Sequence, residues 1–131
     1  PMILIASNMK QIANLIDYNA INQTVIESWP GHTTWLLPAS TACPQWLYEK
    51  DSRKVAIRVT AHSTVVSICN NFKKPIISTS ANKSMDDPIT KIEKIKDVFN
   101  NEIDFIVEGC LGNEPNPSVI RDLETGKMIR G

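Results

Sequence analysis

The amino-acid sequence predicts an α/β or α+β domain, in which helices flank a twisted, mixed β-sheet. Short apolar runs of strand length alternate with segments whose apolar residues recur at helical spacing. The chain then closes with two strand-like runs around a short turn, which is typical of an antiparallel hairpin. Because crossover helices join parallel strands and hairpins join antiparallel ones, this order predicts a sheet that contains both kinds of pairing.

The expected strands are short and rich in branched apolar residues, as buried strands are. They cover residues 3–6, 34–37, 54–59, 74–79, 103–107, 118–123 and 127–130. The turn residues Glu124-Thr125-Gly126 separate the last two runs, so these two are expected to form the hairpin.

The expected helices are amphipathic. One is capped by Ser7 or Asn8 and runs to about Asp17; the others cover residues 20–29 and 63–72, with a short turn at 44–50. The sequence TKIE, which begins at Thr90, matches a capping box and predicts a further helix there. The residues expected to face inward from 63–72 are Val65, Val66, Cys69 and Phe72.

Length and composition restrict the function classes. With 131 residues, of which 42% are hydrophobic, the chain is expected to form a single domain, 1–131. The 14 basic and 14 acidic residues give a formal net charge of zero, which argues against a purely electrostatic nucleic-acid binder. No membrane-spanning run or signal peptide is visible, so a cytoplasmic protein is expected. The widely spaced Cys43, Cys69 and Cys110 do not predict a disulfide framework or a zinc site.

The segment from Lys74 to Asn82, KPIISTSAN, combines an expected buried strand with small polar residues directly after it. Ligands of open α/β sheets bind at the carboxyl ends of strands, where these polar groups would lie. Ser80 and Asn82 would offer neutral donors to phosphate or carboxylate oxygens. The alternative is an ordinary Asx or Ser/Thr turn, and this segment alone favours that alternative.

A charged residue, Arg58, lies inside the apolar strand VAIRV. A buried guanidinium needs an anionic partner, and its planar fork suits a carboxylate or a phosphate. The partner is either a ligand or an Asp or Glu of the chain itself, and the sequence leaves both readings open.

The standard motifs of nucleotide-binding loops, catalytic triads and metal sites are absent from the sequence. His32 and His62 are too far apart for a helical metal pair, and His62 is expected to cap or flank the helix that follows it. Further polar residues occur at expected strand ends: Ser118 in NPSVIRD and Arg130 in MIRG.

Taken together and in this order, WPGHTTWLLP, VAIRVTAH, KPIISTSAN, NPSVIRD and MIRG resemble the YrdC/TsaC family of threonylcarbamoyl-AMP synthases. The resemblance covers nearly the whole chain, from Ile3 onward. It implies a YrdC-like fold, a twisted mixed sheet flanked by helices with a concave ligand cavity.

The resemblance implies a nucleotidyltransferase that condenses L-threonine, bicarbonate and ATP to threonylcarbamoyl-AMP and pyrophosphate, with Mg²⁺ expected alongside ATP. In the family this product serves tRNA threonylcarbamoyladenosine modification by a TsaD/TsaB/TsaE-type system. The chain looks like the short bacterial type. No side-chain nucleophile is implied, since the chemistry needs positioning and charge neutralisation.

The resemblance also implies residue roles. Ser80 and Asn82 match the S-x-N element that holds ATP phosphates, and Arg130 matches a nucleotide-contacting arginine. Arg58 resembles the arginine that fixes the threonine carboxylate, and Ser78 and Ser118 match positions that line the threonine side.

The chain also departs from the family pattern. The N-terminal Y-P-T-E-type strand and K-x-R motif are missing, so the domain is expected to be N-terminally truncated and this chain alone inactive or nearly so. His32 stands where the family usually has proline. The alternatives are a YrdC-like module that binds double-stranded RNA or tRNA without synthase activity and, less favoured, a carbamoyl-transfer domain of hydrogenase maturation.

Overall fold

The computed structural model describes residues 2–83, 85–112 and 116–131. Contacts between residues divide the chain into two compact units. The first unit comprises residues 1–78 and 114–131, and the second comprises residues 79–113. The single-domain organisation stays a prediction.

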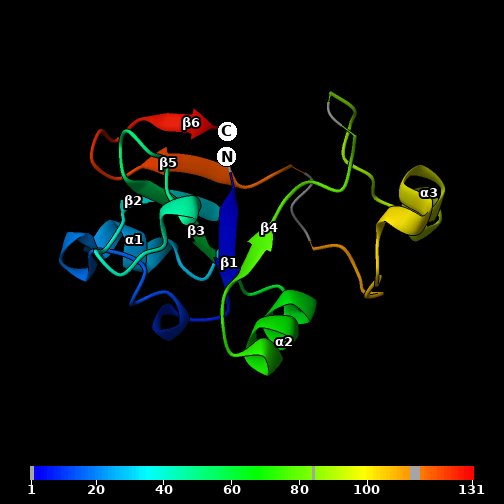
Figure 1. Cartoon of the computed structure of the whole chain (residues 1–131), viewed down its shortest axis with the longest axis horizontal. Coiled ribbons are helices and arrows are strands. Elements are labelled where there is room, and N and C mark those ends of the chain that lie inside the picture. The colour runs from blue at the N-terminus through cyan, green and yellow to red at the C-terminus, as the bar shows by residue number, and fades with distance from the viewer. Residues whose placement is uncertain (1, 84, 113–115) are drawn as a thin grey trace. The chain divides into compact units, whose positions relative to one another are not determined.

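The first unit is built on a mixed sheet of six strands (Figure 1). The strands are β1 Ile3–Ala6, β2 Thr33–Pro38, β3 Lys54–Val59, β4 Ile76–Ser78, β5 Val119–Asp122 and β6 Met128–Arg130. Their order across the sheet is β4-β1-β3-β2-β5-β6. β1 pairs with β3, and β2 with β5, in parallel, whereas the β1–β4, β2–β3 and β5–β6 pairs are antiparallel. The predicted mixed sheet is therefore confirmed.

Two apolar clusters occupy opposite faces of this sheet, because alternate residues of each strand point to opposite sides. On one face, Leu4, Trp35 and Ile57 pack against residues of the segment between β1 and β2, among them Ile12 and Val25. That segment contains α1 Gln23–Ser28 and the 3-10 turns Met9–Gln11 and Tyr18–Ala20.

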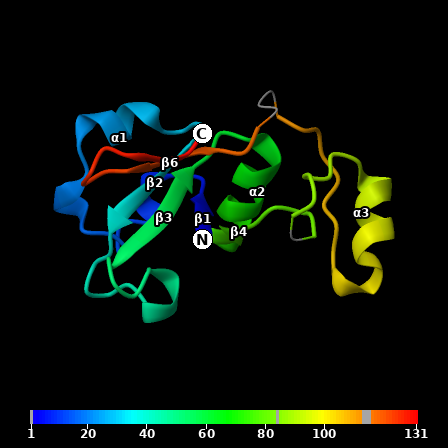
Figure 2. The same cartoon turned by 90° about the horizontal axis from the view of Figure 1, so that it is seen from above.

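The opposite face carries Ile3, Ile5, Ala56 and Ile120, and Cys69 of α2 Ser63–Phe72 packs against this cluster. Figure 2 shows α2 beside β1 and β4, on one side of the sheet. The helix therefore covers the part of this face that β1 and β4 form. The 3-10 turn Gln45–Leu47 lies in the β2–β3 connection.

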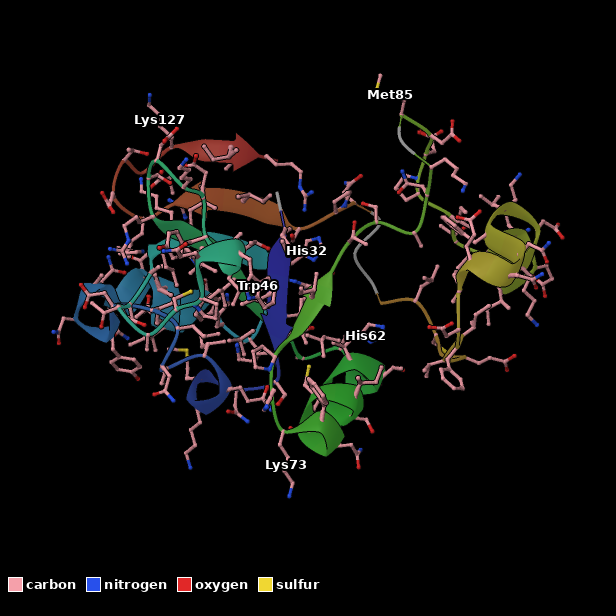
Figure 3. All side chains as sticks on the ribbon, viewed as in Figure 1. His32, Trp46, His62, Lys73, Met85 and Lys127 are labelled. Carbon is pink, nitrogen blue, oxygen red and sulfur yellow. The ribbon has the colours of Figure 1, made fainter. Side chains whose placement is uncertain are left out.

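The second unit contains α3 Ile92–Phe99, followed by the 3-10 turn Asn100–Glu102. Lys83 ties the start of the unit to this region, since its Nζ lies 3.2 Å from a Glu102 carboxylate oxygen and 4.9 Å from the ring centroid of Phe99. Large apolar side chains remain exposed here, including Met85, labelled in Figure 3, and Phe105.

Several predicted elements are confirmed. Strands 3–6 and 54–59 and helix 63–72 have the predicted bounds, and strand 34–37 is one residue longer at each end. The hairpin is present as β5 and β6, and Gly126 in its turn has a φ of 72°. His62 is the N-cap residue of α2, which agrees with a position flanking that helix.

Other predictions are wrong. No strand forms at 103–107, where Phe105 is 90% exposed. The helix expected up to Asp17 is a single 3-10 turn, which Asn8 caps by accepting from the Gln11 amide. α1 begins at Gln23 after an Asn22 cap, later than the predicted residue 20. The end of α2 points Phe72 outward, where it is 58% exposed.

The strand expected at 74–79 and the capping box at Thr90 also differ from the prediction. β4 spans only Ile76–Ser78 and is a half-exposed edge strand, because just one neighbour, β1, pairs with it among the described residues. The N-cap of α3 is Lys91, with no side-chain hydrogen bond, so the capping box does not form.

Candidate functional site

Two arginines lie close together at one end of the sheet. Arg58 is the second-last residue of β3 and pairs with Ile5 of β1. Continuation of the β2–β3 register places Thr34 on its other side. Arg130 ends β6 and pairs with Ile120 of β5. We call Arg58, Arg130, Ser118 and Thr34 the arginine corner.

Hydrogen bonds connect three of these residues directly. The hydroxyl groups of Thr34 and Ser118, both buried, are 2.8 Å apart. Arg130 donates from Nη2 to Ser118 Oγ at 3.0 Å and from Nε to the Ser118 carbonyl at 2.9 Å. Because both bonds end on one residue, the Arg130 guanidinium is held in a fixed orientation at the start of β5.

The Arg58 guanidinium is half-buried, and Nη1 donates to the carbonyl of Gly31 at 3.3 Å. No Asp or Glu in the described part of the chain forms a salt bridge with it. Burial, and after it the positive charge of Arg130, lowers the pKa of Arg58. A partly desolvated cation beside a second cation is unfavourable until an anion joins the pair, so the corner fits an anionic ligand.

The turn before β2 supports both arginines. The Gly31 amide donates to Val59 O at 2.9 Å, which fastens the turn to the end of β3. A Cβ atom at Gly31 would lie 2.5 Å from the carbonyl oxygen of Ser28, so glycine is required by this close approach. On the other side, His32 Nε2 lies 2.7 Å from the Asn116 carbonyl, just before Ser118.

Ser78 lies on the same face of the sheet but away from the corner. It pairs with Ile3, whereas Arg58 pairs with Ile5, and β1 lies between their strands. Two strand spacings, about 10 Å, therefore separate the Cα atoms of Ser78 and Arg58 across the sheet. The half-exposed Ser78 is not brought into contact with Ser118 or the arginines.

Ser80 and Asn82 belong to the second unit. Ser80 is exposed. Asn82 donates from Nδ2 to the carbonyls of Lys83 at 2.9 Å and Asp86 at 3.0 Å, which shapes the loop that follows. Its Oδ1 is buried and has no hydrogen-bond partner among the described residues. In this structure the amide donors of Asn82 are thus used by the loop.

A hollow of about 320 Å³ lies on the sheet face that carries Arg58, towards the β2–β3 connection. Its floor consists of Leu36, Ala56 and Ile120, and Tyr48 and Lys54 lie at its side. None of the six site residues predicted from the sequence lines this hollow. The ligand cavity implied by the resemblance therefore stays a prediction.

The described residues offer neither a cluster of metal ligands nor a membrane-spanning helix. No group of three or more His, Cys, Asp or Glu residues among them is arranged to hold a metal ion. Within the same residues, no helix is long and apolar enough to cross a membrane.

Sequence reasoning missed Thr34, and it noted His32 only as a departure from the proline usual in the family. Both make their contacts with residues 84 positions away in sequence, which local patterns do not reveal. The alternation within β2 carried one usable signal, since Thr34 is polar in a run whose neighbours Trp35 and Leu37 are core residues.

Comparisons with known proteins agree with the resemblance seen in the sequence. The profile of the Sua5/YciO/YrdC family, described as "Telomere recombination", matches residues 1–130. A threonylcarbamoyl-AMP synthase from Coxiella burnetii strain RSA 493 is 44% identical over 131 residues, which cover 98% of this chain and 69% of the relative. One from Blochmanniella pennsylvanica is 41% identical, with coverages of 98% and 68%. The chain thus spans about two thirds of the length of these relatives.

Solved structures share the fold. The crystal structure of P. abyssi Sua5 complexed with L-threonine matches with a TM-score of 0.81 and 25% identity, over 95% of this chain and 37% of that chain. E. coli YciO matches with a TM-score of 0.83 over 98% of this chain and 64% of its own, at 21% identity, which bears on the fold alone.

Proposed function

The chain belongs to the Sua5/YciO/YrdC family, and we propose that it is a threonylcarbamoyl-AMP synthase, a nucleotidyltransferase that uses L-threonine, bicarbonate and ATP. The observation that carries this proposal is the arginine corner, where two guanidinium groups lie close together without an acidic partner in the described residues. The names of the 44% and 41% identical relatives supply the reaction.

Arg58 is proposed to hold the threonine carboxylate. Its half-buried guanidinium keeps Nη2 and Nε for a ligand while Nη1 contacts Gly31, and a guanidinium fork matches a carboxylate in geometry and charge. Ser118, tied to Thr34 and Arg130, is proposed to line the threonine side as a neutral group. Ser78 keeps the same proposed role from the sequence.

Arg130 in the first unit and, separately, Ser80 and Asn82 in the second unit are each proposed to contact ATP. Arg130 contributes positive charge, while Ser80 and Asn82 contribute neutral groups at the loop after β4. For Asn82 to donate to a phosphate, at least one of its two bonds to loop carbonyls must be exchanged for the ligand. Mg²⁺ would arrive as part of the substrate, coordinated mainly by phosphate oxygens and water, as is usual for this ion.

The proposed reaction has two bond-forming steps. The neutral threonine amine attacks bicarbonate, water leaves, and an N-carboxylate forms on threonine. An oxygen of this carbamate then attacks the α-phosphate of ATP, the bond to the β-phosphate breaks, and pyrophosphate leaves. Arg58 and Arg130 would hold the two anions at reacting distance and offset their mutual repulsion, which is catalysis by positioning and electrostatics.

We further propose that the product passes to a tRNA-modifying system of the TsaD/TsaB/TsaE type in the cytoplasm. The mixed anhydride between a carbamate and a phosphate is an activated carbamoyl donor, so a reaction that transfers the carbamoyl group must consume it. The described residues contribute no membrane-spanning helix to this picture.

The test measures pyrophosphate release and the threonylcarbamoyl-AMP mass with all three substrates and with each one omitted, together with threonine binding measured by calorimetry. Product that requires all three substrates would establish the activity. Threonine binding without turnover would support the proposed role of Arg58 and contradict nucleotidyl transfer by this chain. A chain that neither turns over nor binds threonine would refute the proposal.

A further inference from the structure

We infer that His32 is a positioning residue, which holds the entry to β5 so that Ser118 and Arg130 face the substrate. This inference rests on the proposed function for its effect on threonine, while the positioning itself follows from contacts within the first unit. His32 is half-buried at the turn before β2 and is labelled in Figure 3.

The hydrogen bond fixes which ring nitrogen carries the proton. His32 Nε2 lies 2.7 Å from the carbonyl oxygen of Asn116, and a carbonyl oxygen accepts. Nε2 therefore carries a hydrogen, in the neutral ring as well as in the imidazolium. This hydrogen bond does not require a charge on His32.

The backbone of His32 also contacts the start of β5. The His32 carbonyl accepts from the Val119 amide at 3.0 Å, so side chain and main chain of His32 bracket the three residues 116–118. Ser118 lies inside this bracket, and its carbonyl and hydroxyl are the two groups to which Arg130 donates. Movement of residues 116–118 would consequently displace Ser118 and both anchors of Arg130.

His32 also connects the two arginines. Gly31, its chain neighbour, accepts from Arg58 and donates to Val59 at the end of β3. The turn thus contacts Arg58 on one side and, through His32 and Asn116, the Ser118–Arg130 pair on the other. Loss of the ring contact should change the distance between the guanidinium groups, on which an anionic ligand depends.

The experiment compares His32→Phe with His32→Gln. Phenylalanine keeps a planar ring and lacks a donor, whereas the Nε2 of glutamine is the same number of bonds from Cα as the Nε2 of histidine. Amide hydrogen exchange at Val119 reports the position of the β5 entry, and amides of the central strand β3 serve as the internal control. Threonine dissociation constants measured by calorimetry report the effect on the site.

We expect His32→Phe to accelerate exchange at Val119 while β3 is unchanged, and to weaken threonine binding roughly three- to tenfold, the usual effect of one lost hydrogen bond. His32→Gln should restore both. Unchanged exchange and affinity in His32→Phe, or equal losses in both variants, would overturn the inference. If the unmodified chain does not bind threonine, the proposed function fails, and exchange at Val119 with rescue by glutamine still decides whether His32 positions β5.

Discussion

Arg58 shows how one residue can carry information about a ligand. Its neighbours in β3, Ile57 and Val59, are buried, and the chain provides it with a carbonyl from Gly31 and a nearby like charge from Arg130. An arrangement that stabilised the fold for its own sake would place a carboxylate there. The unfavourable environment of this cation is therefore better explained by a bound anion than by stability.

Replacing Arg58 with lysine should weaken threonine binding by about tenfold or more while leaving the melting temperature nearly unchanged. An ammonium group keeps the charge but does not reproduce two parallel hydrogen bonds to a carboxylate. The measurement is threonine calorimetry alongside thermal unfolding. Lys127→Arg, which changes an exposed cation in the β5–β6 turn, is the control. A clearly lower melting temperature of Arg58→Lys with threonine affinity intact would identify Arg58 as a structural residue.

Gly31→Ala should impair both stability and threonine binding. The added Cβ meets the Ser28 carbonyl oxygen at 2.5 Å, so the turn must shift, and the Gly31 carbonyl that holds Arg58 shifts with it. We expect a loss of more than about 1 kcal/mol in the free energy of unfolding, measured with urea.

Gly126→Ala is the matched control for this change. Gly126 has a φ of +72°, and a Cβ there would have nothing within 4 Å, so the cost is backbone strain alone, about 1 kcal/mol. It lies in the β5–β6 turn, away from Arg58, and should leave threonine affinity unchanged. If both glycine variants weakened threonine binding equally, the close approach at Gly31 would not explain the loss.

At the scale of elements, a nearly buried ion pair joins the end of β5 to the start of β3, across β2. Lys54 Nζ lies 2.8 Å from Asp122 Oδ2, and the two side chains are 13% and 10% exposed. The other oxygen, Oδ1, accepts from the amides of Glu124 and Thr125 and so forms the turn. Burial alone would raise the pKa of Asp122, but these hydrogen bonds outweigh it, and the pKa is lowered.

The hairpin should consequently lose stability in acid. Since the folded-state pKa of Asp122 lies below that of the unfolded chain, about 3.9, its contribution is present above that pH and disappears as the pH falls through the folded-state value. In Asp122→Asn the turn acceptor remains and the titration is lost. The difference in unfolding free energy between wild type and Asp122→Asn should thus shrink from pH 6 to pH 3; a constant difference would contradict this assignment.

Elements were predictable where local sequence and tertiary burial agree. The strand at 3–6 is a continuous apolar run, and the strand at 54–59 is apolar except for Lys54 and Arg58. Both lie in the centre of the sheet, and their predicted bounds are those observed. The run at 103–107 has a similar composition but no sheet partner in the described residues. Apolar content alone therefore predicted a strand that does not form. In the site, Arg58 was predictable because a charge interrupts an apolar strand, whereas the contacts of His32 and Thr34 bridge 84 positions and leave no local pattern.

At the scale of the whole molecule, charge balance separates an enzyme acting on small anions from a nucleic-acid binder. The chain has a formal net charge of zero, and its arginine corner is a local concentration of two cations. Affinity for nucleic acid grows with the number of phosphates that a surface neutralises, and each contributes to the salt dependence. A site built from two arginines is large enough for a carboxylate and a phosphate group but small for a tRNA surface.

We therefore expect this chain to bind tRNA no more tightly than a dissociation constant of about 10⁻⁴ M near physiological salt, the weak end of non-specific binding. Fluorescence anisotropy with labelled tRNA at two salt concentrations measures this, and the same preparation is tested for threonine binding to show that it is folded and competent. A double variant, Lys94→Glu with Lys96→Glu, reverses exposed charges of α3 and should not change the result. Micromolar binding that weakens steeply with salt would instead support the RNA-binding module, because it would require a phosphate-contacting surface well beyond Arg58 and Arg130.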